Sequence, residues 1–100
     1  MAVKSTSGAD RITVFNYCSI YTSGSSSIRD SYNTSSITEH NTSNYQIFFT
    51  NSAGNSNYST ACNVDVETNQ WVNTLGSGSY RISTGGGLGS SIVCGIVFQN

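Results

Sequence analysis

Charged residues are scarce in this chain of 100 residues: four Lys and Arg stand against five Asp and Glu, which gives a formal net charge of −1 at pH 7. Proteins that bind nucleic acid or anionic membrane surfaces use basic patches, and so few positive charges cannot build one. The apolar runs are also far shorter than the ~20 residues of a membrane-spanning helix. We therefore expect no nucleic-acid partner and no insertion into a membrane.

Proline is absent, so the turns must be made by Gly, Asn, Asp and Ser. The first ten residues, MAVKSTSGAD, also lack the apolar segment of a secretory signal. We expect residues 1–11 to be a polar leader or linker and residues 12–100 to form one domain, because this length fits a single domain.

Cysteine is infrequent, and its spacing excludes the usual frameworks. Cys18, Cys62 and Cys94 are odd in number and contain no CxxC pair, which argues against a zinc site and against a complete set of disulfides. Strand alternation points all three side chains toward the interior, where free thiols act as small apolar groups. We expect three unpaired, mostly buried thiols, no metal, no cofactor and folding in a reducing cytosol.

Helical periodicity is missing as well; apolar residues recur instead at every second position between clusters of Gly, Ser and Asn. Tyr58, Cys62 and Val64 are an example, since polar residues alternate with them. Such segments predict six or seven short strands and an all-β fold, a small antiparallel β-sandwich. The predicted strands lie at residues 11–21, 27–32, 35–40, 45–50, 58–68, 79–84 and 90–100, and residues 69–78 and 85–89 are predicted loops.

Large side chains occupy both alternating sets of the first predicted strand. Val14 and Cys18 belong to the set expected inside, whereas Phe15 and Tyr17 point outward, as does Phe48 in the segment YQIFF. A strand that is apolar on both faces is usually covered on both. The sequence therefore favours association of more than one chain, with the outward rings buried between subunits.

Catalytic constellations find little support. His40 is the only histidine, and the neighbouring Glu39 points to the opposite face of a strand, so the two cannot form a hydrogen-bonded pair there. Asp65 and Glu67 share a predicted strand face about 6.5–7 Å apart, but exposed acids in this arrangement are typical of solvated surface. The glycine-rich segment 85–89 precedes a strand, whereas a phosphate-binding loop precedes a helix. We expect no enzyme; the enzymatic alternative, a hydrolase of surface polysaccharide, would need acids clustered in a cleft.

Hydroxyl and amide side chains with scattered aromatic rings make up most of what remains. Neutral amides and hydroxyls match the hydroxyl groups of sugars as donors and acceptors, and a flat ring packs on the apolar face of a pyranose. Trp71 is the single tryptophan and a candidate for such a ring, although it could equally bury itself at a subunit contact. This chemistry favours carbohydrate recognition.

The segment FNYCSIYTSGSSSIRDSYNTSSITEHNTSNYQIFFTNSAGNSNYS and the later YRIST and IVCGIVF resemble, in order and spacing, the C-terminal domain of many bacteriophage tail fibre proteins. The similarity extends from Phe15 to Phe98. The chain departs from that family at Tyr17, where Trp is usual, and at residues 39–41, where Glu-His-Asn replaces the common Asp-Asn-Gly. The positions that match are Ser23, Gly24, Ile28, Arg29, Ser31, Asn33, Ser35, Ser36, Ile37, Thr38, Tyr45, Ile47, Phe49, Thr50, Asn57 and Tyr58.

The resemblance implies a small β-sandwich, similar in shape to some invertebrate lectins, that forms a homotrimer at the tip of a fibre. Such a domain folds in the host cytoplasm, is displayed on the virion and binds a bacterial surface glycan or other receptor during adsorption. The alternative is a free-standing sugar-binding lectin with a similar sandwich fold.

Ligand contact is expected on loops at one end of the sandwich. Residues 39–44 and 70–73 would form these loops, with Tyr80 and Arg81 beside them. The candidate ligand-binding residues are Glu39, His40, Asn41, Asn44, Trp71, Asn73, Tyr80 and Arg81.

Overall fold

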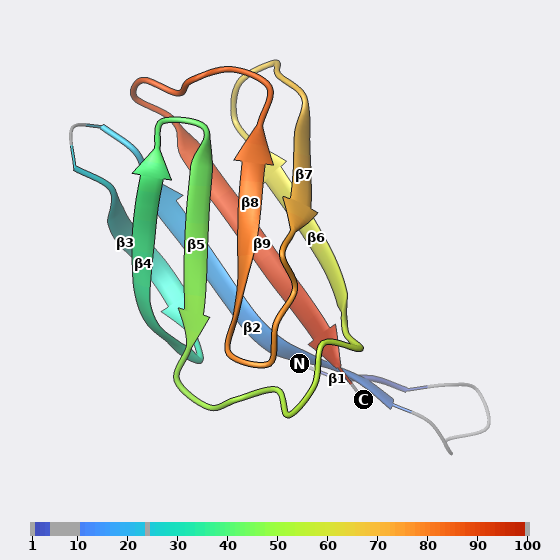
Figure 1. The fold of residues 1–100 in the computed structure, drawn as a ribbon. Coiled ribbons are helices and arrows are strands. Elements are labelled where there is room, and N and C mark those ends of the chain that lie inside the picture. Colours follow the sequence, from blue (N-terminus) through green and yellow to red (C-terminus); the bar gives the residue numbers. More distant parts are fainter. Residues whose placement is uncertain (1, 5–10, 24, 100) are drawn as a thin grey trace.

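The computed structural model describes residues 2–4, 11–23 and 25–99, and within them the fold is all-β, with no helix and two antiparallel sheets (Figure 1). None of these residues belongs to a helix that is long and apolar enough to span a bilayer. The strands are β1 (Ala2–Lys4), β2 (Arg11–Tyr21), β3 (Ser27–Tyr32), β4 (Thr34–Asn41), β5 (Asn44–Phe49), β6 (Ser59–Val64), β7 (Gln70–Asn73), β8 (Ser79–Thr84) and β9 (Ile92–Gln99).

The two sheets lie face to face as a β-sandwich. The first sheet has the strand order β1-β2-β9-β6, and β3 also pairs with β2; the second has the order β4-β5-β8-β7. The chain passes from the first sheet to the second between β3 and β4 through Asn33, whose φ of 55° lies in the left-handed region that Asn tolerates better than most residues. The predicted fold class is therefore confirmed at the level of a two-sheet antiparallel domain.

Three details of the strands differ from the prediction. Ala2–Lys4, in the expected polar leader, form a strand paired with β2, while residues 5–10 of that leader lie outside the described residues. Gln70–Asn73, expected in a loop, form β7, a four-residue edge strand too short to show alternation in the sequence. The sixth strand ends at Val64, so Asp65 and Glu67 lie in the following loop and do not share a strand face.

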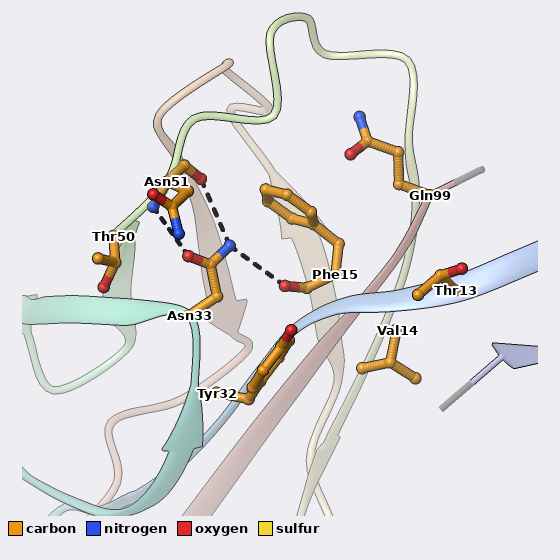
Figure 2. Close-up of a pocket in the computed structure, with 8 residues that line it drawn as sticks. All are labelled: Thr13, Val14, Phe15, Tyr32, Asn33, Thr50, Asn51 and Gln99. Carbon is orange, nitrogen blue, oxygen red and sulfur yellow. Dashed lines mark hydrogen bonds between the residues drawn. The ribbon is translucent and has the colours of Figure 1, made fainter.

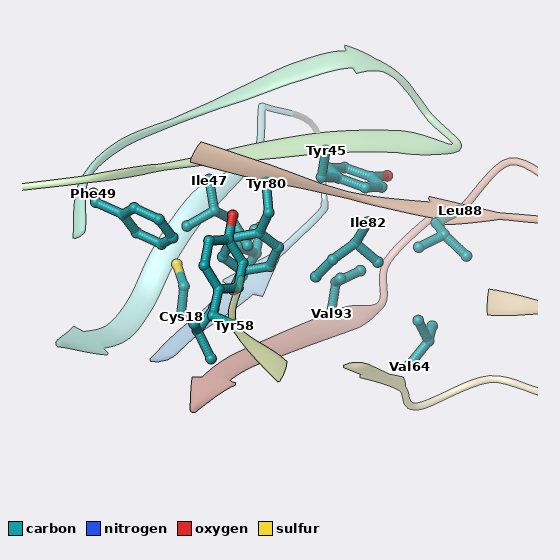
Figure 3. Close-up of a cluster of buried hydrophobic side chains, with 12 residues drawn as sticks. Cys18, Tyr45, Ile47, Phe49, Tyr58, Val64, Tyr80, Ile82, Leu88 and Val93 are labelled. Atoms are coloured by element: carbon teal, nitrogen blue, oxygen red, sulfur yellow. The ribbon is translucent and has the colours of Figure 1, made fainter. Parts of the chain in front are cut away.

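The core fills the space between the two inner faces, and Figure 3 shows its side chains converging from both sheets. In the second sheet, Phe49 packs beside Tyr80 with ring centroids 5.8 Å apart and against Tyr58 at 5.9 Å. The loop that contains the glycine-rich segment connects β8 to the strand β9, as expected, and its Leu88 closes one end of the core. The buried apolar residues are Cys18, Ile20, Tyr45, Ile47, Phe49, Tyr58, Val64, Tyr80, Ile82, Leu88, Val93 and Val97.

A register shift between Val14 and Asn16 in the pairing of β2 with β9 reverses the expected orientation of the first part of β2. Phe15, expected to point outward, instead packs against the core, with its ring 5.1 Å from Phe49 in an edge-to-face arrangement. Val14, expected inside, lines a hollow on the outer side of the first sheet together with Tyr17. A bulge adds one residue, and the sequence pattern alone did not reveal it.

Asn16 is fully buried where the two sheets meet. Its Nδ2 lies 2.9 Å from the Tyr32 carbonyl, 3.0 Å from the Asn33 carbonyl and 2.8 Å from the Thr34 hydroxyl. Its Oδ1 accepts a hydrogen bond of 3.2 Å from the Tyr80 hydroxyl. One amide from β2 therefore holds both the β3–β4 connection and β8.

The three cysteines are unpaired, as predicted. Cys18 is buried, and Cys62 packs against the core. Cys94 was expected inside but points outward beside Ser19, whose Oγ is 3.4 Å from its Sγ. The neighbouring Gly95 faces the interior, where an added Cβ would meet Tyr80 and lie 2.8 Å from Ile82 Cδ1, and strand alternation therefore places Cys94 on the outer side.

Candidate functional site

The outer side of the second sheet carries a polar face. Strand register places Asn44, Ser83 and Trp71 side by side on β5, β8 and β7. Two residues along each strand, Gln46, Arg81 and Asn73 form a parallel row. Since register partners on one side of a sheet lie about 4.5–5.5 Å apart, these side chains form one continuous surface. We define the polar face as His40, Asn44, Gln46, Trp71, Asn73, Arg81 and Ser83.

Hydrogen bonds within the polar face hold its amides in place. Ser83 Oγ accepts from Asn73 Nδ2 at 2.9 Å and from Asn44 Nδ2 at 3.3 Å. Gln46 Oε1 lies 2.8 Å from His40 Nε2, and Gln46 Nε2 donates to Ser79 Oγ at 2.9 Å. The amide groups are therefore preorganised on rigid strands, which reduces the entropy lost when a ligand binds.

Two polar atoms of this face are buried and have no hydrogen-bond partner in the described structure: Asn44 Oδ1 and Arg81 Nε. Such atoms are uncommon in native proteins, and they mark positions where water or a ligand completes the bonding. One is an acceptor and the other a donor, and both lie beneath the exposed surface of the face. Gln70 Oε1, the third such atom, belongs to the residue before Trp71.

Trp71 supplies the aromatic surface. It lies on the edge strand β7 and is 47% exposed, so one part of the indole is packed and the rest faces solvent. A partly fixed, solvent-facing indole beside amide groups is suited to stacking on a sugar ring.

Five of the eight predicted site residues lie on the polar face: His40, Asn44, Trp71, Asn73 and Arg81. They occupy a sheet surface rather than the loops that the sequence suggested. The observed surface is nevertheless near the predicted end loops, because the β4–β5 turn and the start of β7 are at the same end of the sandwich (Figure 1).

The other three predicted residues have different roles. Tyr80 is fully buried in the core and bonded to Asn16, so its expected place beside the ligand is wrong. Asn41 shapes the β4–β5 turn, because its Oδ1 accepts from both the amide and the hydroxyl of Ser43 at 2.8 Å. The Glu39 carboxylate accepts a hydrogen bond from the Ser26 hydroxyl, away from His40, in agreement with the expected opposite orientations.

Gln46 and Ser83 are the residues that the sequence did not single out. Their alternation with the buried Tyr45, Ile47 and Ile82 already indicated that they point outward. Their position beside Asn44 and Trp71 depends on strand order and register, which the sequence does not state.

A second candidate is the pocket of about 470 Å³ shown in Figure 2, at the opposite end of the sandwich. Asn33 lines this pocket, but both polar atoms of its side-chain amide already form hydrogen bonds within the chain. Nδ2 donates to the carbonyls of Phe15 and Asn51, and Oδ1 accepts from the Asn51 backbone amide at 2.8 Å. Gln99 likewise donates to the Ala53 carbonyl at 2.9 Å. These polar groups hold the chain together at this end, so the pocket has fewer groups left for a ligand. Its lining consists of Thr13, Val14, Phe15, Tyr32, Asn33, Thr50, Asn51 and Gln99.

The outer side of the first sheet is different in chemistry. Two hollows of about 390 and 240 Å³ share Tyr17 and Ile96. Tyr17 stacks on Tyr32 with ring centroids 6.3 Å apart, and the Asp30 carboxylate near its hydroxyl raises the pKa of Tyr17. We define the apolar face as Val14, Tyr17, Tyr32, Ala61, Cys94 and Ile96.

The described residues contain no group of three or more His, Cys, Asp and Glu side chains placed to hold a metal ion. Comparison of the chain with models of protein families, with curated proteins and with solved structures finds no match.

Proposed function

We propose that this chain is a receptor-binding domain of a bacteriophage tail fibre and that its polar face binds a glycan of the bacterial surface. The observation that carries the proposal is the juxtaposition of a half-exposed Trp71 with the fixed amides of Asn44 and Asn73 on one rigid sheet. Sugars need this pair of features, an apolar platform and directed donors and acceptors. The resemblance of the sequence to fibre tips supplies the biological setting.

The proposal includes assembly as a homotrimer through the apolar face. Tyr32 on this face is 56% exposed in the single chain, and the neighbouring hollows are lined mainly by carbon. Contiguous apolar surface of this kind is normally covered by a partner. Contact through the first sheet leaves the polar face of each subunit open, and three weak sites on one tip gain strength through effective concentration.

The sugar-binding part of the proposal is tested on an array of bacterial surface polysaccharides and by adsorption to a panel of bacterial strains. Trp71→Ala and Asn44→Ala should each reduce binding by about five- to thirtyfold, because stacking and a directed hydrogen bond are each worth about 1–2 kcal/mol. Leu75→Ala is the matched control, since Leu75 is exposed to a similar degree but follows the far end of β7. Unchanged binding in both site variants, with circular dichroism unchanged, would show that the ligand binds elsewhere.

Assembly is tested by light scattering in dilute solution. The expected mass is three times the chain mass of 10.6 kDa, and the mass of one chain would refute the trimer.

The free-standing lectin alternative uses the same polar face and is distinguished by the absence of a fibrous stalk upstream of the domain. The hydrolase alternative predicts shorter chains after incubation with polysaccharide.

A further inference from the structure

We infer that the ligand of the polar face is an acidic glycan and that Arg81 binds its sugar carboxylate. This inference rests on the proposed function, because it names the class of sugar for the same site. It is carried by the position of Arg81, by the absence of described acids around it and by the single charge that it presents.

Arg81 lies in the middle of the polar face. It is on β8, an inner strand of the second sheet, with Gln46 as its register partner on β5 and Asn73 on β7. Its Nε is buried without a hydrogen-bond partner in the described structure. A guanidinium partly removed from water among neutral amides loses hydration and gains no counter-charge from its neighbours.

Of the four described acidic residues, three make their contacts elsewhere, and the fourth, Glu67, lies exposed in the loop before β7. Glu39 is bonded to Ser26, and Asp30 lies on β3 in the first sheet near Tyr17. Asp65 accepts from the Ile92 amide at 3.0 Å, in the loop after β6. A ligand that brings its own carboxylate would therefore supply the partner that this part of the chain does not.

A carboxylate fits this arrangement better than a phosphate. Arg binds either group through parallel N–H donors, but a phosphate monoester carries a charge of about −1.5 to −2 and is usually met by clustered cations. On the polar face the only other ionisable side chain is His40, whose Nε2 is occupied by Gln46. One fixed positive charge matches one carboxylate.

The rest of a sugar ring finds complementary groups around Arg81. Register places Trp71 diagonally from Arg81, one strand across and two residues along, and such diagonal neighbours lie about 7–8 Å apart. This separation is comparable with the width of one substituted pyranose. Asn44 is in the row of Trp71, with its amide beside the Ser83 hydroxyl, and adds polar groups to this surface.

The test uses the same polysaccharide array with three arms: acidic polysaccharides, the same polymers after reduction of their carboxyls to alcohols, and phosphate-bearing polymers. Reduction should weaken binding by about tenfold or more, as expected for loss of a charge-assisted hydrogen-bonded pair. Arg81→Gln should produce the same loss on the acidic polymers and no further loss on the reduced ones. Raising NaCl from about 0.05 to about 0.5 M should weaken only the acidic arm.

Arg29→Gln is the matched control, because it removes the same charge from β3 in the other sheet. Arg81→Lys keeps the charge without the paired donors and should bind acidic polymers with intermediate strength. Binding of neutral glycans that is sensitive to Trp71→Ala but not to Arg81→Gln would overturn the carboxylate assignment and leave the proposed function standing. Preference for phosphate-bearing polymers would also overturn it, and an array without any binder would reject both.

Discussion

Replacement of Asn16 by Ala should lower the free energy of unfolding by about 3 kcal/mol, a large part of the ~5–15 kcal/mol that a domain typically has. The Tyr80 hydroxyl loses its bond to Asn16 Oδ1, and the Tyr32 carbonyl and the Thr34 hydroxyl lose their bonds from Nδ2, at about 1–2 kcal/mol for each buried group left unpaired. The Tyr32 carbonyl keeps only a weak bond of 3.4 Å from the Thr34 hydroxyl. The Asn33 carbonyl keeps its bond from the Thr50 amide, which limits the loss. The missing side-chain atoms add a small cavity cost.

A double-mutant cycle with Tyr80→Phe tests whether the Asn16–Tyr80 bond contributes as calculated. The phenylalanine variant alone should lose about 1–2 kcal/mol, because Asn16 Oδ1 is left without a donor. The double variant should be about 1 kcal/mol more stable than the sum of the single losses, since both remove the same bond. Asn57→Ala, at an exposed position in the loop before β6, is the control and should change stability by less than about 0.5 kcal/mol.

Urea unfolding followed by circular dichroism measures these values, with all variants at one protein concentration because the proposed subunit association would also contribute to stability. A loss below about 0.5 kcal/mol for Asn16→Ala would refute the role given to this amide. Additive losses in the cycle would refute the direct bond to Tyr80 while leaving the other contacts of Asn16 possible.

Four further results are expected. Gly95→Ala should lower the free energy of unfolding, measured in urea, by about 1–3 kcal/mol, because the new Cβ would lie 2.8 Å from Ile82 Cδ1. The control Gly86→Ala should lower it by less than about 1 kcal/mol, because a Cβ there meets no atom within 4 Å. Burial raises the pKa of Cys18 from 9.0 to about 11, so native Cys18 should resist thiol reagents at pH 8 and react after denaturation. The unfolded chain releases the Cys18 proton first, so this thiol's contribution to stability should fall as the pH rises from about 9 to about 11. Tyr17→Arg should reduce the mass measured by light scattering to that of one chain, because it places a charge on the apolar face; an unchanged mass would place the subunit contact elsewhere.

Alternation allowed much of this fold to be predicted, because inner strands that are apolar at every second residue can bury only that side. In β5 the buried Tyr45, Ile47 and Phe49 follow the pattern seen in the sequence. The pattern failed in β9, where Val93, Cys94, Ile96 and Val97 make both sets apolar and only the tight packing over Gly95 decides which set is inside.

The candidate site was predictable by residue type but not by geometry. Trp71, Asn44 and Arg81 were selected because their chemistry suits a sugar, and the structure places all three on one face. Tyr80 has the same chemistry, yet it is buried in the core, because its hydroxyl donates a hydrogen bond to the buried Asn16. Whether a polar aromatic residue is internal depends on such a partner, which here lies 64 residues away in the chain.

The two outer faces of the sandwich differ although the strands beneath them bury similar cores. On β9 the outward residues include Cys94 and Ile96, while on β8 they are Ser79, Arg81 and Ser83. Burial of apolar surface stabilises a contact by about 25 cal/mol for each Å² removed from water. The outer side of the first sheet is therefore better suited to contact with another protein surface than to exposure. On the second sheet, the amides, hydroxyls and guanidinium beside Trp71 favour a ligand rich in hydroxyls or charge. The proposed assembly through one sheet and the proposed recognition through the other therefore use different surfaces. Variants of Tyr17 should consequently change the assembly without changing the intrinsic affinity for sugar. Variants of Trp71 should change the affinity for sugar without changing the assembly.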